Sequence, residues 1–280
     1  MRVLISALLI IVAMSGVALS ETGGFAAFTV GGVKVISLSD TYGNGDTSKL
    51  IGYTAEQKAK YTPDDKIIFS VNAYLVVTKN KTVLIDAGMG KNAGKMFDAL
   101  TKAGVNPKNI NIVAITHMHG DHIGGLLTDG KPSFPNAELW ISAPEKKYWY
   151  DETKNESAVK AIDAYGKKVK LFKQGDKITP EIASLETIGH TPGHTSYLLT
   201  SGSDSLLIWG DLMHVYEVQF PLPQIAITYD TDAKTAVSSR LRILDEAVKN
   251  KWRIAGVHLP FPGIGYATKD GDGYKWNPDK

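Results

Sequence analysis

Apolar residues recur in short runs along most of the chain, and their spacing predicts alternating strands and helices. Several runs alternate between apolar and polar residues and many are β-branched, which is typical of strands. The predicted strands include residues 25–30, 33–38, 71–78, 82–85, 110–115, 138–142, 184–188, 196–200, 206–209 and 254–258. Since strands and helical patterns are mixed from end to end, the sequence predicts an α/β fold in a single domain over residues 21–280.

Three segments carry the spacing of helices, at residues 92–103, 158–168 and 233–248. The last is the clearest, because its apolar positions recur every three or four residues. Asp232 and Ser157 are placed to cap two of these helices. A capping box at residues 54–57 predicts a short helix inside the polar stretch 41–66. That stretch is interpreted either as a lid over a site or as a surface connection.

The N-terminus has the pattern of a secretory signal peptide. Arg2 precedes an apolar run over residues 3–18, and Ala18-Leu19-Ser20 offers the small residues that precede cleavage. The run is short for a transmembrane span, so cleavage is favoured over an anchor. We therefore expect residues 1–20 to be removed, and the mature protein to be secreted or periplasmic with no membrane span.

Composition and charge narrow the class of protein further. With 43% apolar and 21% charged residues, the chain is ordinary for a globular protein. A formal charge of +2, without any block of like charge, argues against a nucleic-acid or membrane-surface partner. Because the chain has no cysteine, any metal site must be built from histidine and carboxylate.

The run His117-Met118-His119-Gly120-Asp121-His122 is the strongest candidate for such a site. It follows an apolar segment predicted to be a buried strand. Residues two apart in an extended chain point the same way, so His117 and His119 can face one ion. Gly120 allows a bend that carries Asp121 and His122 toward a second ion.

Four further residues lie at the ends of predicted strands and are expected to lie at the same sheet edge. His194 lies in a Gly-Pro-Gly turn, while Asp211 and His258 each end a strand. Asp86 is interpreted either as a support for a ligand imidazole or as an ordinary turn residue. His190 is assigned no role, because a lone histidine is usually a surface or core residue.

In this order of ligands the chain resembles the metallo-β-lactamase superfamily. The segments 134–137, 189–195, 218–220 and 258–265 look similar to its branch of methyl-parathion-hydrolase-like enzymes and exported lactonases. The resemblance implies a four-layer αβ/βα sandwich, with two mixed sheets face to face and helices outside. It also implies two metal sites, one of His117, His119 and His194 and one of Asp121, His122 and His258, with Asp211 bridging.

This ligand chemistry suits two divalent ions, most readily zinc, although manganese, iron or cobalt fit as well. Two such ions about 3.5–4 Å apart can share a hydroxide at neutral pH. Asp121 is expected both to bind metal and to carry a proton to the leaving oxygen. His214, three residues after Asp211, is interpreted either as a donor to the substrate or as a packing residue.

The predicted reaction is hydrolysis of a small hydrophobic lactone, either an acyl-homoserine or an aryl lactone. Trp149, Phe69, Phe220 and Phe261 are the candidate substrate contacts. Phosphotriester hydrolysis is the alternative, because it needs the same two-metal site. A β-lactamase is disfavoured by the bridging Asp211, and a metal-binding protein without activity by the complete ligand set. The oligomeric state is left open, although relatives are often dimers.

Overall fold

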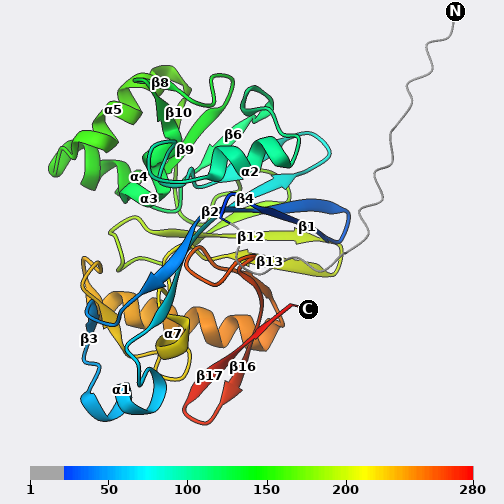
Figure 1. Cartoon of the computed structure of the whole chain (residues 1–280). Coiled ribbons are helices and arrows are strands. Elements are labelled where there is room, and N and C mark those ends of the chain that lie inside the picture. Colours follow the sequence, from blue (N-terminus) through cyan, green and yellow to red (C-terminus); the bar gives the residue numbers. More distant parts are fainter. Residues whose placement is uncertain (1–21, 280) are drawn as a thin grey trace, which may run out of the picture.

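The computed structural model describes residues 22–279, so the predicted signal peptide lies outside the described residues. Two large sheets lie face to face with helices on both outer sides (Figure 1). This arrangement confirms the predicted αβ/βα sandwich. Between residues 22 and 279, no helix is both long and apolar enough to cross a membrane.

The first sheet has seven strands in the order β1-β2-β4-β5-β6-β9-β10. Its pairings are antiparallel from β1 to β5 and parallel from β5 to β10. The strand bounds are β1 Phe25–Val30, β2 Val33–Gly45, β4 Ile67–Val77, β5 Thr82–Ile85, β6 Ile112–Ala114, β9 Glu138–Ser142 and β10 Val169–Phe172.

The second sheet has six strands in the order β11-β12-β13-β15-β16-β17, and only β13 and β15 pair in parallel. The bounds are β11 Ile182–Glu186, β12 Thr195–Ser201, β13 Asp204–Ile208, β15 Arg253–Ala255, β16 Ile264–Asp270 and β17 Gly273–Pro278. Two small pairs lie outside the sandwich. They are β3 Leu50–Ile51 with β14 Ala226–Ile227, and β7 Leu127–Thr128 with β8 Lys131–Pro132.

The helices are α1 Ala55–Tyr61, α2 Met96–Lys102, α3 Gly120–Ile123, α4 Ala143–Lys146, α5 Glu156–Tyr165, α6 Tyr216–Gln219 and α7 Ala233–Asn250. Short 3₁₀ turns lie at Pro107–Asn109, Gly124–Leu126 and Gly166–Lys168, and a π-helical turn at Lys147–Glu152. The predicted caps of α1 and α7 are confirmed at Thr54 and Asp232. The cap of α5 is Asn155 and not Ser157, because the helix begins two residues earlier than predicted.

Three buried layers hold the sandwich together. In β4, Ala73 and Leu75 face α2 and α5, whereas Tyr74 and Val76 face the second sheet. A third cluster packs α7 against the outer side of the second sheet. Successive residues of a central strand therefore point into two different cores, which is why these strands are apolar on both faces.

Strands β10, β16 and β17 were not predicted from the sequence. Most of their residues are exposed or only partly buried, because β10 is an edge strand and β16–β17 form an edge hairpin. Strand pairing, not apolar patterning, places these segments in the sheets.

Candidate metal centre

The run from His117 to His122 lies where the first sheet ends. Strand β6 stops at Ala114, and the chain continues as a loop to His119, which is the N-cap residue of α3. Helix α3 then turns Asp121 and His122 to a different side from His117. The predicted division of this run between two ions therefore has a simple local cause, which is an extended loop followed by one helical turn.

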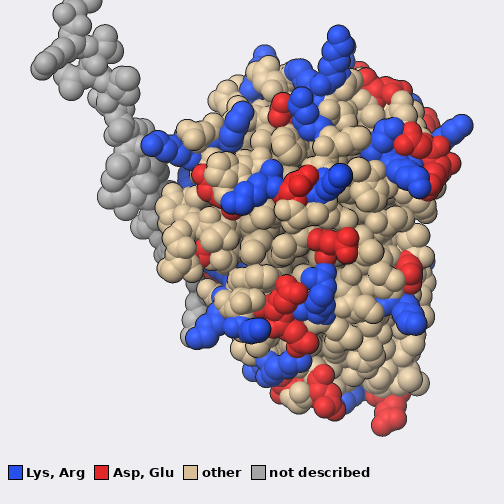
Figure 2. All heavy atoms as spheres, turned by 180° about the vertical axis from the view of Figure 1, so that it is seen from behind, with Lys and Arg blue, Asp and Glu red and all other residues tan. Residues whose placement is uncertain are grey.

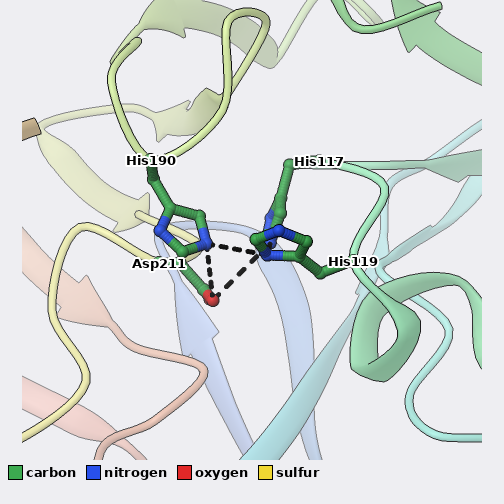
Figure 3. Close-up of side chains that lie close together, drawn as sticks. All are labelled: His117, His119, His190 and Asp211. Atoms are coloured by element: carbon green, nitrogen blue, oxygen red, sulfur yellow. Dashed lines mark hydrogen bonds and ion pairs between the residues drawn. The ribbon is translucent and has the colours of Figure 1, made fainter. Parts of the chain in front are cut away.

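Four side chains form a first group of metal-ligating type: His117, His119, His190 and Asp211 (Figure 3). Their ligand atoms all lie within 4.8 Å of one another. Nδ1 of His119 lies 2.9 Å from Nε2 of His117 and 3.0 Å from Nε2 of His190. Three nitrogens and one carboxylate oxygen thus converge on one point, as the ligands of a tetrahedral zinc ion do.

A second group consists of Asp121, His122, Asp211 and His258. Oδ1 of Asp211 lies 3.1 Å from Nε2 of His122, and its Oδ2 lies 3.1 Å from Nε2 of His258. Asp211 belongs to both groups, in the bridging place that the superfamily resemblance implies for it. His122 Nε2 and Asp211 Oδ1 are buried and make no hydrogen bond. Such unpaired atoms facing each other are what a metal ion between them would satisfy.

His194 lies outside both groups, although the superfamily resemblance implied that it is a metal ligand. Its ring is fully buried, and both of its nitrogens are engaged by the protein. Nδ1 contacts the carbonyl oxygen of Thr187 at 2.9 Å, while Nε2 accepts the backbone N–H of Asp211 at 2.9 Å. His194 therefore orients the residue that carries the shared carboxylate. His190, to which the sequence assigned no role, takes the predicted place of His194.

Three of the converging imidazoles are held by a partner on the ring nitrogen that faces away from the site. His122 Nδ1 contacts Asp86 at 2.8 Å, and His190 Nδ1 contacts Asp230 at 2.8 Å. His258 Nδ1 donates to the carbonyl oxygen of Ser70. Partners of this kind fix the ring orientation and leave Nε2 for metal. Of the two interpretations of Asp86, the structure supports the one that places it behind a ligand imidazole.

Asp230 was missed from the sequence, because a lone aspartate in a polar turn carries no pattern that distinguishes it.

Burial and charge oppose each other within the site. Burial alone would raise the pKa of Asp211, but the imidazoles of His122 and His258 hold it well below its ordinary value. Burial also opposes charge on His190, yet its hydrogen bonds to the Asp211 and Asp230 carboxylates raise its pKa to about 9. A metal ion binds only neutral imidazole, so an ion at this site competes with a proton on His190.

A cavity of about 590 Å³ opens over the two groups. Its floor includes the side chains of His119, Asp121, Asp211 and His258. One wall comes from the β3–β14 pair, and another from residues 67–69 of β4. Gly45, Asp46 and residues 48–50 also line it, so part of the polar stretch 41–66 is a wall of this cavity.

The predicted aromatic contacts are only partly in this cavity. Phe69 lines it, with its ring 6.1 Å from that of His258. Phe220 and Phe261 do not, because both are buried in the body of the protein and border a different cleft of about 700 Å³. Trp149 packs against His119 in an edge-to-face arrangement, with the ring centroids 5.3 Å apart. The π-helical turn at Lys147–Glu152 carries Trp149.

His214 lines the cavity, with Nε2 3.1 Å from Oδ2 of Asp211 and its ring stacked on that of His258 at 4.9 Å. Burial lowers its pKa to about 4, although Asp211 opposes the shift, so the ring is neutral at pH 7. Its Nδ1 is buried without a hydrogen-bond partner among residues 22–279. Because Nε2–H of the neutral ring faces the Asp211 carboxylate, the unpaired Nδ1 carries the lone pair, and the ring suits hydrogen bonding better than proton storage.

Several known proteins are similar to this chain in sequence. YobT of Bacillus subtilis (strain 168) is 32% identical over 152 residues, which cover 51% of this chain and 62% of YobT. An N-acyl homoserine lactonase from a Bacillus species is 23% identical over 218 residues, which cover 68% of this chain and 81% of that enzyme.

Two solved structures match most of the chain. The hydrolase AbOPH has a TM-score of 0.85 and 30% identity, covering 93% of this chain and 99% of its own. AidC, described as a dizinc quorum-quenching lactonase and solved with an N-acyl-L-homoserine product, has a TM-score of 0.86 and 28% identity. That match covers 94% of this chain and 98% of AidC.

The profile of the metallo-beta-lactamase superfamily matches residues 67–254, which span the candidate ligands from His117 to Asp211. With the matching fold and the His/Asp groups, this confirms the prediction of a metal-dependent hydrolase. The chain belongs to the metallo-beta-lactamase superfamily.

Proposed function

We propose that the protein is a dinuclear metal-dependent hydrolase that opens lactone rings. The observation that carries this proposal is the pair of ligand groups that share Asp211 at the floor of a largely apolar cavity. The first group would hold one ion through His117, His119 and His190. The second would hold the other through Asp121, His122 and His258. Zinc fits these nitrogen and oxygen ligands, and AidC is a dizinc enzyme.

When bound, two such ions lower the pKa of water and polarise a substrate carbonyl. The protein's own groups then have to position the substrate and move a proton. Oδ2 of Asp121 lies 3.6 Å from Nε2 of both His122 and His258, and this side chain also lines the cavity. Burial would raise the pKa of Asp121, but His122 and His258 lower it, so it is a carboxylate at neutral pH. We propose that it accepts a proton from the attacking water and returns it to the leaving alkoxide.

The cavity favours an ester with an apolar arm. Its lining includes five aliphatic side chains, those of Leu50, Ile67, Ile68, Val215 and Ile227. They provide an apolar surface for an acyl chain, while the lactone carbonyl lies over the ligands. The similar lactonase AidC was solved with an acyl-homoserine product, which supports an acyl-homoserine lactone as the substrate class.

A panel assay tests this proposal. Purified protein with measured metal content is given an acyl-homoserine lactone, an aryl lactone, a phosphotriester and a cephalosporin under identical conditions. We expect the highest kcat/KM on a lactone. A dominant rate on the phosphotriester would move the assignment to the alternative reaction, and a dominant rate on the cephalosporin would refute the lactonase assignment.

His214 is proposed to hydrogen-bond the substrate. We expect His214→Leu to lower kcat/KM for a lactone about 10- to 100-fold, because the ring Nε2–H that faces Asp211 is then no longer available to donate to the substrate oxygen. Metal content should stay at that of the parent protein, since seven other side chains supply the ligands.

His214→Gln keeps a donor at this position and serves as the matched control. It should recover part of the lost rate. If His214→Leu turns over lactone as fast as the parent protein, His214 only packs beside His258 and has no role in the reaction.

We also propose export of the protein, on the basis of the leader pattern at residues 1–20. N-terminal sequencing of protein recovered outside the cytoplasm should give a start near Glu21. Protein recovered only with Met1 intact would contradict export.

The charged side chains on the face shown in Figure 2 are mixed in sign, so this face offers no single-sign field for a polyanionic partner.

A further inference from the structure

Glu145 is a buried carboxylate that touches neither ligand group. It lies near the start of α4, whose N-cap is Ser142, and only 1% of its surface is exposed. Burial raises the pKa of Glu145, whereas the hydrogen bonds that it accepts lower it. Burying a carboxylate is costly unless every oxygen is paired, so the partners of Glu145 show what it is used for.

Four donors surround this one carboxylate. Oε1 accepts the backbone N–H of Met118 at 2.8 Å and the indole N–H of Trp149. Oε2 accepts the hydroxyl of Thr191 at 2.7 Å and the backbone N–H of Gly193 at 2.9 Å. One oxygen thus binds the loop after β6, and the other binds the loop before β12.

These two loops carry the three histidines of the first ligand group. Met118 lies between His117 and His119, and Thr191 directly follows His190. A Cβ on Gly193 would lie 2.2 Å from the backbone nitrogen of Glu145, so this loop packs directly on the start of α4. Trp149 extends the contact, because its ring lies against His119 while its N–H binds Glu145.

The second ligand group has no such link. His122 and His258 are held by Asp86 and by the carbonyl oxygen of Ser70, and neither hydrogen-bonds to Glu145. The hydrogen bonds of the Glu145 carboxylate therefore reach the loops of the first ligand group and not the side chains of His122 or His258.

We propose that Glu145 is a positioning residue that sets the spacing of the two loops and thereby the affinity of the first metal site. It does so without touching metal or substrate. The inference rests on the proposed two-ion site, and it predicts an asymmetry that the two-ion site alone does not. Changes at Glu145 should weaken the site of His117, His119 and His190 and spare the site of Asp121, His122 and His258.

The substitution Glu145→Gln is informative because the four donors are not equivalent. An amide nitrogen in place of Oε1 would face two N–H groups, and neither can accept a hydrogen bond. In place of Oε2 it would face the Thr191 hydroxyl, which can turn and accept, and the Gly193 N–H, which cannot. The glutamine should therefore keep its oxygen toward Met118 and leave Gly193 unpaired, so the His190 loop is loosened first.

The experiment is a zinc titration of the metal-free protein in competition with a chromogenic chelator. The parent protein should bind two ions per chain. Glu145→Gln should bind one of them roughly 10- to 100-fold more weakly, which is the usual effect of removing a partner behind a metal ligand. The weakened ion should be the one lost in His190→Ala and kept in His258→Ala. Trp149→Phe, which removes one donor and keeps an aromatic ring, should give a smaller change at the same site.

Asp40→Asn is the matched control. Asp40 is also a fully buried carboxylate that accepts two backbone N–H groups, from Met89 and Met96, but it contacts neither histidine loop. Its substitution should lower the Tm and leave both zinc affinities within about threefold.

The outcomes separate the two proposals. Glu145→Gln with two parental affinities would overturn the positioning role, and so would an equal weakening of both ions or the same pattern in Asp40→Asn. A parent protein that binds fewer than two ions would instead overturn the two-ion site itself, and with it the premise of this inference.

Discussion

Replacing Asp211 by alanine is expected to abolish tight binding of at least one ion and to lower lactone kcat/KM by at least about 10³-fold. The reason is that Asp211 belongs to both ligand groups, so a single substitution removes a ligand from each. It also removes the carboxylate that lies within 3.1 Å of His122, His214 and His258. Metal analysis after gel filtration, together with steady-state kinetics, measures both effects.

Asp211→Asn is the control for this substitution, since it keeps one oxygen in place and the volume of the side chain. We expect it to retain more metal than the alanine variant. A fully active Asp211→Ala protein that carries two ions would show that the shared carboxylate is not a ligand.

Substitution of His190 should lower metal affinity, whereas substitution of His194 should lower the stability of the fold. His190→Ala should weaken binding of one ion roughly 100-fold and lower activity accordingly, because an Nε2 ligand is lost and Asp230 is left without its partner. His194→Ala should instead lower stability by about 1–3 kcal/mol, because the N–H of Asp211 is left unpaired in the interior. Its metal content should remain at two.

Metal titration and thermal unfolding of the two variants, side by side, provide the measurement. If His194→Ala lost an ion while His190→Ala kept both, the assignment made from the sequence would be right and the one based on the geometry wrong.

The local sequence does not distinguish His190 from His194, and the reason is physical. The segment Gly189-His190-Thr191-Pro192-Gly193-His194 places each histidine directly after a glycine, so the local pattern treats them alike. Two distant contacts distinguish them. Gly189 has a φ of 125° and packs directly against Ala236 of α7, and the backbone of Asp211 donates to His194. Neither contact can be inferred from spacing along the chain.

The predictions that succeeded depend on short-range order. The run from His117 to His122 combines a strand end with one helical turn, and both are visible in the local sequence. The central strands and α7 are apolar in a clear period, so their positions were predicted within a few residues. The sandwich follows from these elements together with the superfamily resemblance.

The side chains that the structure places elsewhere than expected depend on how distant segments pack. Phe220 and Phe261 are as apolar as Phe69, and only the tertiary packing puts Phe69 in the cavity and the other two in the interior. Glu145 was not singled out from the sequence, for the same reason. The sequence Ser142-Ala143-Pro144-Glu145 resembles the start of a helix, and Ser142 does cap α4. The carboxylate itself is nevertheless turned away from the cap and toward the two histidine loops.

The most direct test of the two-ion site is a stepwise zinc titration of the metal-free protein, with lactone hydrolysis measured at each step. The account predicts that binding saturates at two ions per chain and that most activity appears with the second. Full activity at one ion per chain, or hydrolysis by the metal-free protein, would contradict it.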